Sequence, residues 1–199
     1  MKIAGIYLAA GKSSRMGKNK LALPVGNTLL GTMALKTALQ SSLEKVYIIT
    51  NSLEDLSWLE SLIEHEKVSI IACPSAHLGQ AESIKCGIRS AQTEEMDAIM
   101  VLLADQPYIS IKIIEDIIRQ LKNNPALQFV AASNQNIIKP PVLFSASMYP
   151  ALLNLQGDHG AKTLLRGKNK GIGEVLTFSS RKAFLDIDTV DDYNELIKN

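Results

Sequence analysis

Residues 98–104, with the sequence AIMVLLA, form the most clearly buried stretch of the chain and decide its fold. An unbroken apolar run of this length, rich in Ile, Val and Leu, is typical of a strand that is covered on both faces of a parallel sheet. Residues 3–9 are similarly apolar and stop just before a small-residue turn at Gly11, which predicts a first strand of the same kind. Both runs therefore predict the interior of an α/β sheet.

Outward from residues 98–104, strands alternate with segments whose apolar residues recur at a helical period. The expected order is strand 3–9, helix 29–39, strand 45–50, helix 53–63, strand 68–72, helix 79–91, strand 98–104 and a helix that begins near a Ser110 cap. The rest is less regular, with strands at 129–132, 174–178 and 183–187 and helices at 145–155, 161–166 and from Val190. Strand–helix alternation with short connections predicts parallel strands joined by right-handed crossovers.

The length and composition are those of one compact domain with a substantial core. The chain has 199 residues, of which 46% are hydrophobic and 21% are charged. No internal repeat, low-complexity tract or long linker divides it. We therefore expect a single α/β domain over residues 1–199, built on a mostly parallel, Rossmann-like sheet with helices on both faces.

The charged residues are unevenly distributed, although the formal net charge is only +1. Residues 1–43 lack Asp and Glu but carry Lys2, Lys12, Arg15, Lys18, Lys20 and Lys36, while Asp186, Asp188, Asp191, Asp192 and Glu195 gather near the end. A cationic start suits a polyanion such as a triphosphate, and acidic groups suit its metal, although two solvated faces would give the same pattern. The small net charge gives no case for nucleic acid or an anionic membrane as a partner.

The cysteines and the N-terminal segment predict a cytoplasmic protein. Cys73 and Cys86 lack CxxC spacing, so we expect neither a disulfide framework nor a zinc site, in keeping with a reducing compartment. The apolar run at residues 3–10 is too short for a membrane span and lacks the flanks of a signal peptide.

A small-residue turn follows the first strand, where residues 8–17 read LAAGKSSRMG. It is not a P-loop, because Gly5 and Gly11 enclose five residues instead of four, and nothing in the chain spells the dinucleotide fingerprint G-x-G-x-x-G. Such a turn lets backbone N–H groups approach an oxyanion, with Lys12 and Arg15 close by to neutralise it. A tight turn without a ligand needs the same small residues, so the spacing leaves both interpretations open.

Six sequence blocks, taken in order, resemble the signature of the MobA-like nucleotidyltransferases. They are LAAGKSSRMG at 8–17 followed by Lys20, GQAES at 79–83, ADQP at 104–107, PPVLF at 140–144, GDHGA at 157–161, and DIDT at 186–189 with Asp192 and Tyr193. Within this superfamily the chain looks most like the molybdenum cofactor cytidylyltransferases and the accessory proteins of xanthine dehydrogenase maturation. The resemblance covers almost the whole chain and implies a glycosyltransferase-A type fold, with a nucleotide-binding half at 1–107 and an acceptor-binding half at 108–199.

The implied reaction is transfer of CMP from CTP to the phosphate of a molybdopterin-type acceptor, with Mg²⁺ as cofactor and pyrophosphate as the leaving group. Charge then builds on phosphate oxygens, so fixed cations and donors matter more than an acid or a base. The implied recipient of the product is a xanthine dehydrogenase-type molybdoenzyme. The AAG of residues 9–11, in place of the AGG typical of guanylyl members, favours CTP by resemblance.

On the nucleotide side, the family pattern falls on the turn and on the start of the helix at 79–91. By resemblance, the base and phosphates are held by Leu8, Ala9, Ala10, Gly11, Arg15, Lys20, Gly79, Gln80 and Ser83, and the catalytic residues are Lys20, Arg15 and Asp105. Lys20 is expected at the α-phosphate. A plain helix N-terminus would also explain Gly79, Gln80 and Ser83.

Acidic residues from both ends of the chain are the expected metal ligands. Asp105 ends a buried strand, which is where ligands bind in open α/β sheets, and a carboxylate there suits Mg²⁺. The alternative is that Asp105 is only a turn or helix-entry residue, because Asp-x-Pro is common there. Asp188 is the expected second ligand, and Asp186 is a weaker candidate on the same face of an expected strand.

The acceptor side is expected around the GDHGA block. Asp158, His159 and Lys162 are the implied acceptor-binding residues. His159 is expected to bind and not to act as a base, because an acceptor phosphate is already ionised at neutral pH. Pro140-Pro141 stands where the family pattern has a basic or small residue before proline, so Lys139 is expected to take that role. Two alternatives remain: a transferase for another small phosphate, such as a sugar phosphate, methylerythritol phosphate or phospholactate, and a non-catalytic cofactor-carrying chaperone.

Overall fold

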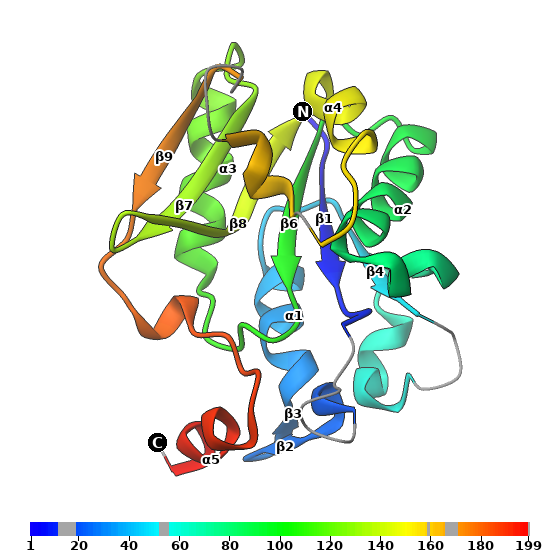
Figure 1. The fold of residues 1–199 in the computed structure, drawn as a ribbon, viewed down its shortest axis with the longest axis vertical. Helices are drawn as coiled ribbons and strands as arrows, with labels where there is room; N and C mark the ends of the chain where they lie inside the picture. Colours follow the sequence, from blue (N-terminus) through cyan, green and yellow to red (C-terminus); the bar gives the residue numbers. More distant parts are fainter. Residues whose placement is uncertain (12–18, 52–55, 159, 166–170, 199) are drawn as a thin grey trace.

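The computed structural model describes residues 1–11, 19–51, 56–158, 160–165 and 171–198 (Figure 1). Within these ranges a seven-stranded sheet has the order β5-β4-β1-β6-β8-β7-β9. The strands are β1 (Ile3–Leu8), β4 (Lys45–Thr50), β5 (Val68–Ala72), β6 (Ala98–Leu103), β7 (Phe129–Asn134), β8 (Ile137–Ser145) and β9 (Gly173–Thr177). A separate two-stranded hairpin pairs β2 (Pro24–Val25) with β3 (Thr28–Leu29).

The first four strands of the large sheet are parallel, as the alternation predicted. Strand β1 pairs with β4 on one side and with β6 on the other, and β4 pairs with β5. The chain thus builds outward from β1 through β4 to β5 and then returns to place β6 on the opposite side of β1. This reversal of strand order lies between β1 and β6, the position at which open α/β sheets bind ligands.

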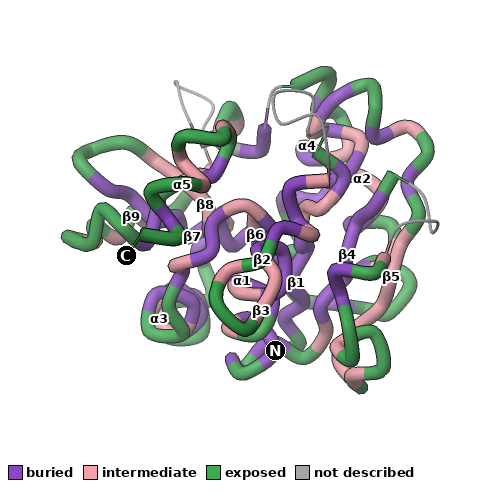
Figure 2. Tube along the Cα trace, turned by 90° about the horizontal axis from the view of Figure 1, so that it is seen from below, coloured by how far each residue is buried: buried purple, intermediate pink, exposed green. Residues whose placement is uncertain are grey.

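Helices cover both faces of the sheet, as expected. Helices α1 (Leu30–Gln40) and α3 (Ile111–Asn123) supply buried residues to one core, and α2 (Gln80–Thr93) and α4 (Tyr149–Leu153) supply them to the other. Figure 2 shows that the tube is largely buried along β1, β4 and β6 and exposed along the outer side of α3. The predicted Ser110 cap is present, since its hydroxyl accepts from the Ile113 N–H at 3.4 Å.

Strand β8 was not predicted from the sequence. It runs antiparallel to both of its neighbours, β6 and β7, and separates them in the sheet. Two consecutive prolines argue against a central strand, because proline cannot donate a ladder hydrogen bond. The structure accommodates Pro140 and Pro141 at a register shift, where Ala131 pairs with Val142 and the next residue, Ala132, pairs with Lys139.

Several other segments differ from the predicted elements. Residues 57–64 form 3₁₀ turns (η2, Ser57–Glu64) interrupted at Glu60, where a continuous helix was expected, and the start of that predicted helix, at 53–55, lies outside the described residues. Residues 183–187 are not a strand: η6 (Lys182–Phe184) covers the start, and an extended segment leads to α5 (Val190–Lys198). The other 3₁₀ helices are η1 (Lys20–Ala22), η3 (Pro74–Leu78), η4 (Ala146–Met148) and η5 (Ala161–Leu165). No helix in the described ranges has the length and apolar character needed to cross a membrane.

The two cysteines form a disulfide, which corrects the expectation from their spacing. Cys73 follows β5 and Cys86 lies on α2, and the fold brings their Cα atoms to 6.2 Å. The sequence motif could not reveal this pair, because the chain passes through η3 and the start of α2 before it returns to Cys73. The cysteine pattern therefore gives no support for a reducing compartment.

Candidate functional site

The candidate site lies at the carboxyl ends of β1 and β6, on either side of the reversal in strand order. Leu8 is paired with Leu103 in the last register of these strands, and the Ala104 N–H donates to the Leu8 carbonyl at 3.2 Å. The small-residue turn after β1 and Asp105 after β6 therefore begin side by side. This is the geometry that the switch point of an open sheet provides for a ligand.

A first pocket of about 470 Å³ opens at this point. Its lining residues are Leu8, Ala10, Gly11, Ala76, His77, Gly79, Gln80, Ser83, Leu103, Asp105 and Asp158. Most of the residues assigned to the nucleotide by resemblance are among them. Ala9 is not, because side chains alternate along extended backbone and Ala9 packs against the core on the other face of the sheet from Leu8 and Ala10. Asp158, which was assigned to the acceptor, lines this first pocket.

Two glycines fix the wall of the first pocket. Gly79 has φ of +128°, and a Cβ on it would lie 2.4 Å from the Gly157 carbonyl carbon. The contact is reinforced by the Ala81 N–H, which donates to the Gly157 carbonyl at 3.1 Å. Glycine at position 79 is thus required by both conformation and space. It sets the start of α2 against the 157–158 loop and so positions Gln80 and Ser83.

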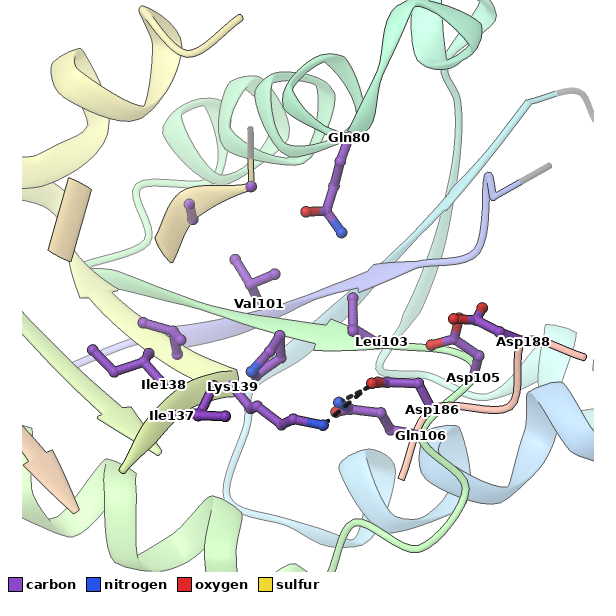
Figure 3. A pocket seen from close by; sticks show the side chains of 14 residues that line it. Gln80, Val101, Leu103, Asp105, Gln106, Ile137, Ile138, Lys139, Asp186 and Asp188 are labelled. Carbon is purple, nitrogen blue, oxygen red and sulfur yellow. Dashed lines mark hydrogen bonds and ion pairs between the residues drawn. The ribbon is translucent and has the colours of Figure 1, made fainter. Parts of the chain in front are cut away.

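A second pocket of about 250 Å³ adjoins the first and lies over β6 and its neighbour β8 (Figure 3). Its lining residues are Gln80, Val101, Leu103, Asp105, Gln106, Ile137, Ile138, Lys139, Pro140, Val142, Gly160, Ala161, Asp186 and Asp188. Most of the apolar side chains come from the adjacent strands β6 and β8. The charged and amide groups come from the ends of β6 and α2, from β8 and from the segment before α5. The pocket therefore has an apolar wall and a polar rim.

A hydrogen-bonded network forms part of that rim. The Gln106 amide Nε2 donates to Asp186 Oδ1 at 2.7 Å, and the Lys139 ammonium lies 3.4 Å from Asp186 Oδ2 (Figure 3). Lys139 also donates to the Phe184 carbonyl at 2.9 Å. Gln106 is only 2% exposed. These contacts fix Asp186 in place at the edge of the second pocket.

Asp105 belongs to both pockets. It lines the first pocket with the turn after β1 and the second with the residues of β8, and Gln80 and Leu103 are shared in the same way. Molecules in the two pockets would approach each other along these shared residues, of which Asp105 is the charged one. Asp105 therefore marks the place where two bound molecules could exchange a group.

Lys20 lies at this junction, where its ammonium contacts oxygen atoms of described residues. Its ammonium lies 2.7 Å from Asp105 Oδ2, 2.9 Å from the Ile187 carbonyl and 3.0 Å from Asp188 Oδ1. Lys20 is 8% exposed. The two aspartates proposed as metal ligands are thus brought together from positions 105 and 188, with the lysine between them.

Burial and charge oppose each other in this cluster. Burial raises the pKa of Asp105, and although Lys20 lowers it in part, Asp186 and Asp188 raise it again. For Lys20, burial acts to lower the pKa, but the carboxylates of Asp105 and Asp188 outweigh burial and raise it. The ammonium is therefore fully charged at neutral pH, and the partly buried Asp105 carboxylate is stabilised by this neighbouring cation.

For three site residues that were assigned from the sequence, the structure does not describe the side chain. Arg15 and His159 lie outside the described residues, as do the neighbouring cations Lys12 and Lys18. The side chain of Lys162 also lies outside the described part of the structure, although its backbone is part of η5. In the described part of the chain, no group of three or more His, Cys, Asp or Glu side chains is arranged to hold a metal ion.

The structure adds residues that the sequence did not single out for the site. Ala76, Ile137 and Ile138 belong to no sequence block and enter the site through the fold, while Pro140 and Val142 of the PPVLF block and Gln106 were not assigned a role in the site. Gln106 does follow Asp105 in the ADQP block, and this adjacency was the available signal. Asp192, by contrast, belongs to α5, because its carboxylate accepts from the Thr189 N–H at 2.7 Å at the start of that helix.

An open sheet with adjoining pockets around an acidic residue at its switch point suits a nucleotide-dependent transferase. The model of the family described as "MobA-like NTP transferase domain" matches residues 5–173. The chain therefore belongs to the MobA-like NTP transferase family, as its sequence blocks indicated.

The relatives that match almost the whole chain include two whose names bear on its function. The Purine catabolism protein PucB of Bacillus subtilis is 34% identical over 197 residues, covering 96% of this chain and 94% of PucB. The Molybdenum cofactor cytidylyltransferase of Escherichia coli is 27% identical over 191 residues, covering 94% of this chain and 92% of that protein.

Solved structures share the fold. Rv0371c from Mycobacterium tuberculosis superposes with a TM-score of 0.83 at 24% identity and covers 100% of this chain and 99% of its own. The same protein has also been solved in complex with manganese, and that structure superposes with a TM-score of 0.78 at 22% identity, covering 100% of both chains. These likenesses establish the single-domain, mostly parallel α/β fold.

Proposed function

We propose that this chain transfers CMP from CTP to the phosphate of a molybdopterin-type acceptor and releases pyrophosphate. The observation that carries the proposal is the pair of pockets that meet at Asp105. A transferase must hold a donor and an acceptor so that their phosphates approach at one place. The likeness to a molybdenum cofactor cytidylyltransferase supports this choice of substrates.

CTP is assigned to the first pocket. This pocket contains the turn after β1 and the start of α2, where Gln80 and Ser83 offer polar groups to a base or ribose. Ala10 lines the pocket and is 8% exposed, so its methyl group limits the space on that side. A pyrimidine is smaller than a purine and suffers less from this methyl group, which favours CTP over GTP.

The acceptor is assigned to the second pocket. Its apolar wall, formed by side chains such as Val101, Ile138 and Val142, suits a flat ring better than a sugar, whose hydroxyls need polar partners. Asp186, fixed by Gln106 and Lys139, can accept hydrogen bonds from ring N–H groups. In functional terms, the nucleotide-binding half is then residues 1–107, with Asp158 added, and the acceptor is held mainly by residues 108–199.

Magnesium is the proposed cofactor, and Asp105 and Asp188 are the residues that would hold it. These carboxylates and the Ile187 carbonyl gather on one ammonium, so the cluster offers the hard oxygen donors that Mg²⁺ takes. Mg²⁺ is commonly held by one or two carboxylates plus substrate phosphates, and a small protein set is therefore sufficient. When bound, the metal supplies positive charge to the triphosphate. The manganese complex of Rv0371c supports a divalent cation in this fold.

Lys20 is the group proposed to meet the α-phosphate, and it would neutralise charge that develops during transfer. The acceptor phosphate attacks the α-phosphorus, and the bond to the bridging oxygen breaks, so the electron pair leaves with pyrophosphate. We also propose that the product serves a xanthine dehydrogenase-type molybdoenzyme, which the likeness to a purine catabolism protein supports.

The test is a screen of CTP, GTP, ATP and UTP for pyrophosphate release, with Mg²⁺ and molybdopterin as the acceptor. We expect release with CTP, dependent on both the acceptor and the metal. Preference for GTP would overturn the assignment as a cytidylyltransferase, but the assignment as a nucleotidyltransferase would stand. Release only with a sugar phosphate, methylerythritol phosphate or phospholactate would overturn the acceptor, and no release with any pair would favour a carrier role.

A further inference from the structure

The Lys20 ammonium occupies the position that the metal ligands define. Asp105, Asp188 and the carbonyl of Ile187 surround it at 2.7, 3.0 and 2.9 Å, and we call these three groups the oxygen cage. Two carboxylate oxygens and a carbonyl are also the kind of ligands that a divalent cation takes. An ammonium and a metal ion therefore compete for the same oxygen atoms.

The charge of the cage makes this competition depend on a third partner. The ammonium is attracted by the Asp105 and Asp188 carboxylates that it contacts. A divalent cation added beside the ammonium would place two cations in contact at a partly buried site. The phosphates of a nucleotide would remove the repulsion between the metal ion and the ammonium, because the ammonium could then pair with the phosphates.

Local hydrogen bonds hold the backbone of Asn19–Leu23, so the ammonium can move by rotation of the Lys20 side chain. The Asn19 side chain accepts from the Leu21 N–H at 3.1 Å, and the Leu23 N–H donates to the Lys20 carbonyl at 3.1 Å. These contacts hold the short helix η1 in place at both ends. Rotation of a long, flexible side chain can therefore carry the ammonium out of the cage without rearrangement of the fold.

We propose that Lys20 is the resident cation of the oxygen cage in the free protein, and that a divalent metal enters only together with a nucleoside triphosphate. The lysine then leaves the carboxylates for the phosphates. Lys20 thus links metal binding to nucleotide binding and prevents occupation of the cage by metal alone. This inference rests on the proposed function for its nucleotide, while its central claim concerns metal binding by the protein itself.

The experiment measures Mn²⁺ binding without nucleotide or turnover, from the electron paramagnetic resonance signal of free Mn²⁺. Lys20→Met removes the ammonium and keeps the length of the side chain. We expect this variant to bind Mn²⁺ more tightly than wild type, roughly 5- to 150-fold, the usual range of a coupling between two ligands. Lys139→Met is the matched control, because it removes one positive charge nearby without emptying the cage. Its Mn²⁺ affinity should stay close to that of wild type.

Equal Mn²⁺ affinity of the wild type and a folded Lys20→Met variant would overturn the proposal. An equal increase in Mn²⁺ affinity in Lys139→Met would also overturn the proposal. The loss of any nearby positive charge would then explain the effect, without a role for the contacts of Lys20. If Lys20→Met does not fold, calorimetry on the wild-type protein still tests the proposal. The wild type should bind MnCTP and should bind Mn²⁺ alone far more weakly. Similar affinities for MnCTP and for Mn²⁺ alone would refute the link between metal binding and nucleotide binding. None of these readouts needs catalysis, so a failure of the proposed reaction would be seen separately.

Discussion

Gly79→Ala should damage the protein more than any substitution of similar size at the other glycines of the site. The structure predicts this from two independent effects. The φ of Gly79 is +128°, a region that other residues rarely enter, and holding alanine there costs on the order of 1–3 kcal/mol. The added Cβ would also lie 2.4 Å from the Gly157 carbonyl carbon, and overpacking of this kind costs roughly 1–3 kcal/mol more.

The sum is a loss of about 2–6 kcal/mol in the free energy of unfolding. For a domain of this size each kcal/mol corresponds to about 2–4 °C in Tm, so Tm should fall by at least about 4 °C. The surviving fold should also bind nucleotide poorly, because relief of the clash moves the start of α2 with Gln80 and Ser83. A shift of about 1 Å in such groups can lower kcat/KM for the nucleotide by on the order of 10²-fold.

Gly157→Ala is the matched control, since it alters the opposite side of the same contact. A Cβ on Gly157 would meet no atom within 4 Å, and its φ of +60° carries only the left-handed cost of about 1–2 kcal/mol. Thermal and urea unfolding of both variants, with nucleotide binding by calorimetry, checks the prediction. Equal losses in the two variants would refute the packing argument, and an unchanged Tm for Gly79→Ala would refute the conformational one as well.

Three further predictions address the base, the charge cluster and a helix cap. Ala10→Gly should raise kcat/KM for GTP while CTP stays preferred, because one methyl group is worth only ~1–3 kcal/mol of discrimination; steady-state kinetics with both nucleotides would show it. Burial raises the pKa of Asp105 above its ordinary 3.8, so the unfolded chain ionises first and the free energy of unfolding should fall as pH rises from about 4. Asp105→Asn should remove this fall in a series of urea unfolding curves. Ser110→Ala should cost about 1 kcal/mol in the same assay, through loss of the hydroxyl that accepts from the Ile113 N–H.

The first half of the fold could be predicted because its signals are local. Each of β1, β4, β5 and β6 is a mainly apolar run, and α1 and α2 carry a helical period, although 3₁₀ turns stand at 57–64 where a helix was expected. Parallel pairing then follows from the connections alone. The position of the candidate site at the switch point followed as well, since this site lies at the ends of β1 and β6.

The contacts inside the site could not be predicted, because they join distant parts of the chain. Lys20 and Asp188 are separated by 168 positions, and no periodicity relates them. Family resemblance placed both in the site, but it assigned the lysine to a phosphate and the aspartate to a metal, and their contact with each other was not foreseen. The disulfide between Cys73 and Cys86 was missed for the same reason, because its partners belong to different elements.

The unpredicted strand β8 explains why the second pocket exists. Because β8 runs antiparallel to β6, it begins at the end of the sheet where β6 finishes, and Val101 pairs with Val142 in the last register before Asp105. The start of β8, with Ile138 and Lys139, therefore lies beside Asp105 and not at the far edge. A parallel strand in this place would have ended there and would have presented a loop to the site. The change from parallel to antiparallel pairing at β6 thus gives one carboxylate a pocket on each side, and the two-substrate reaction proposed for this chain depends on that arrangement.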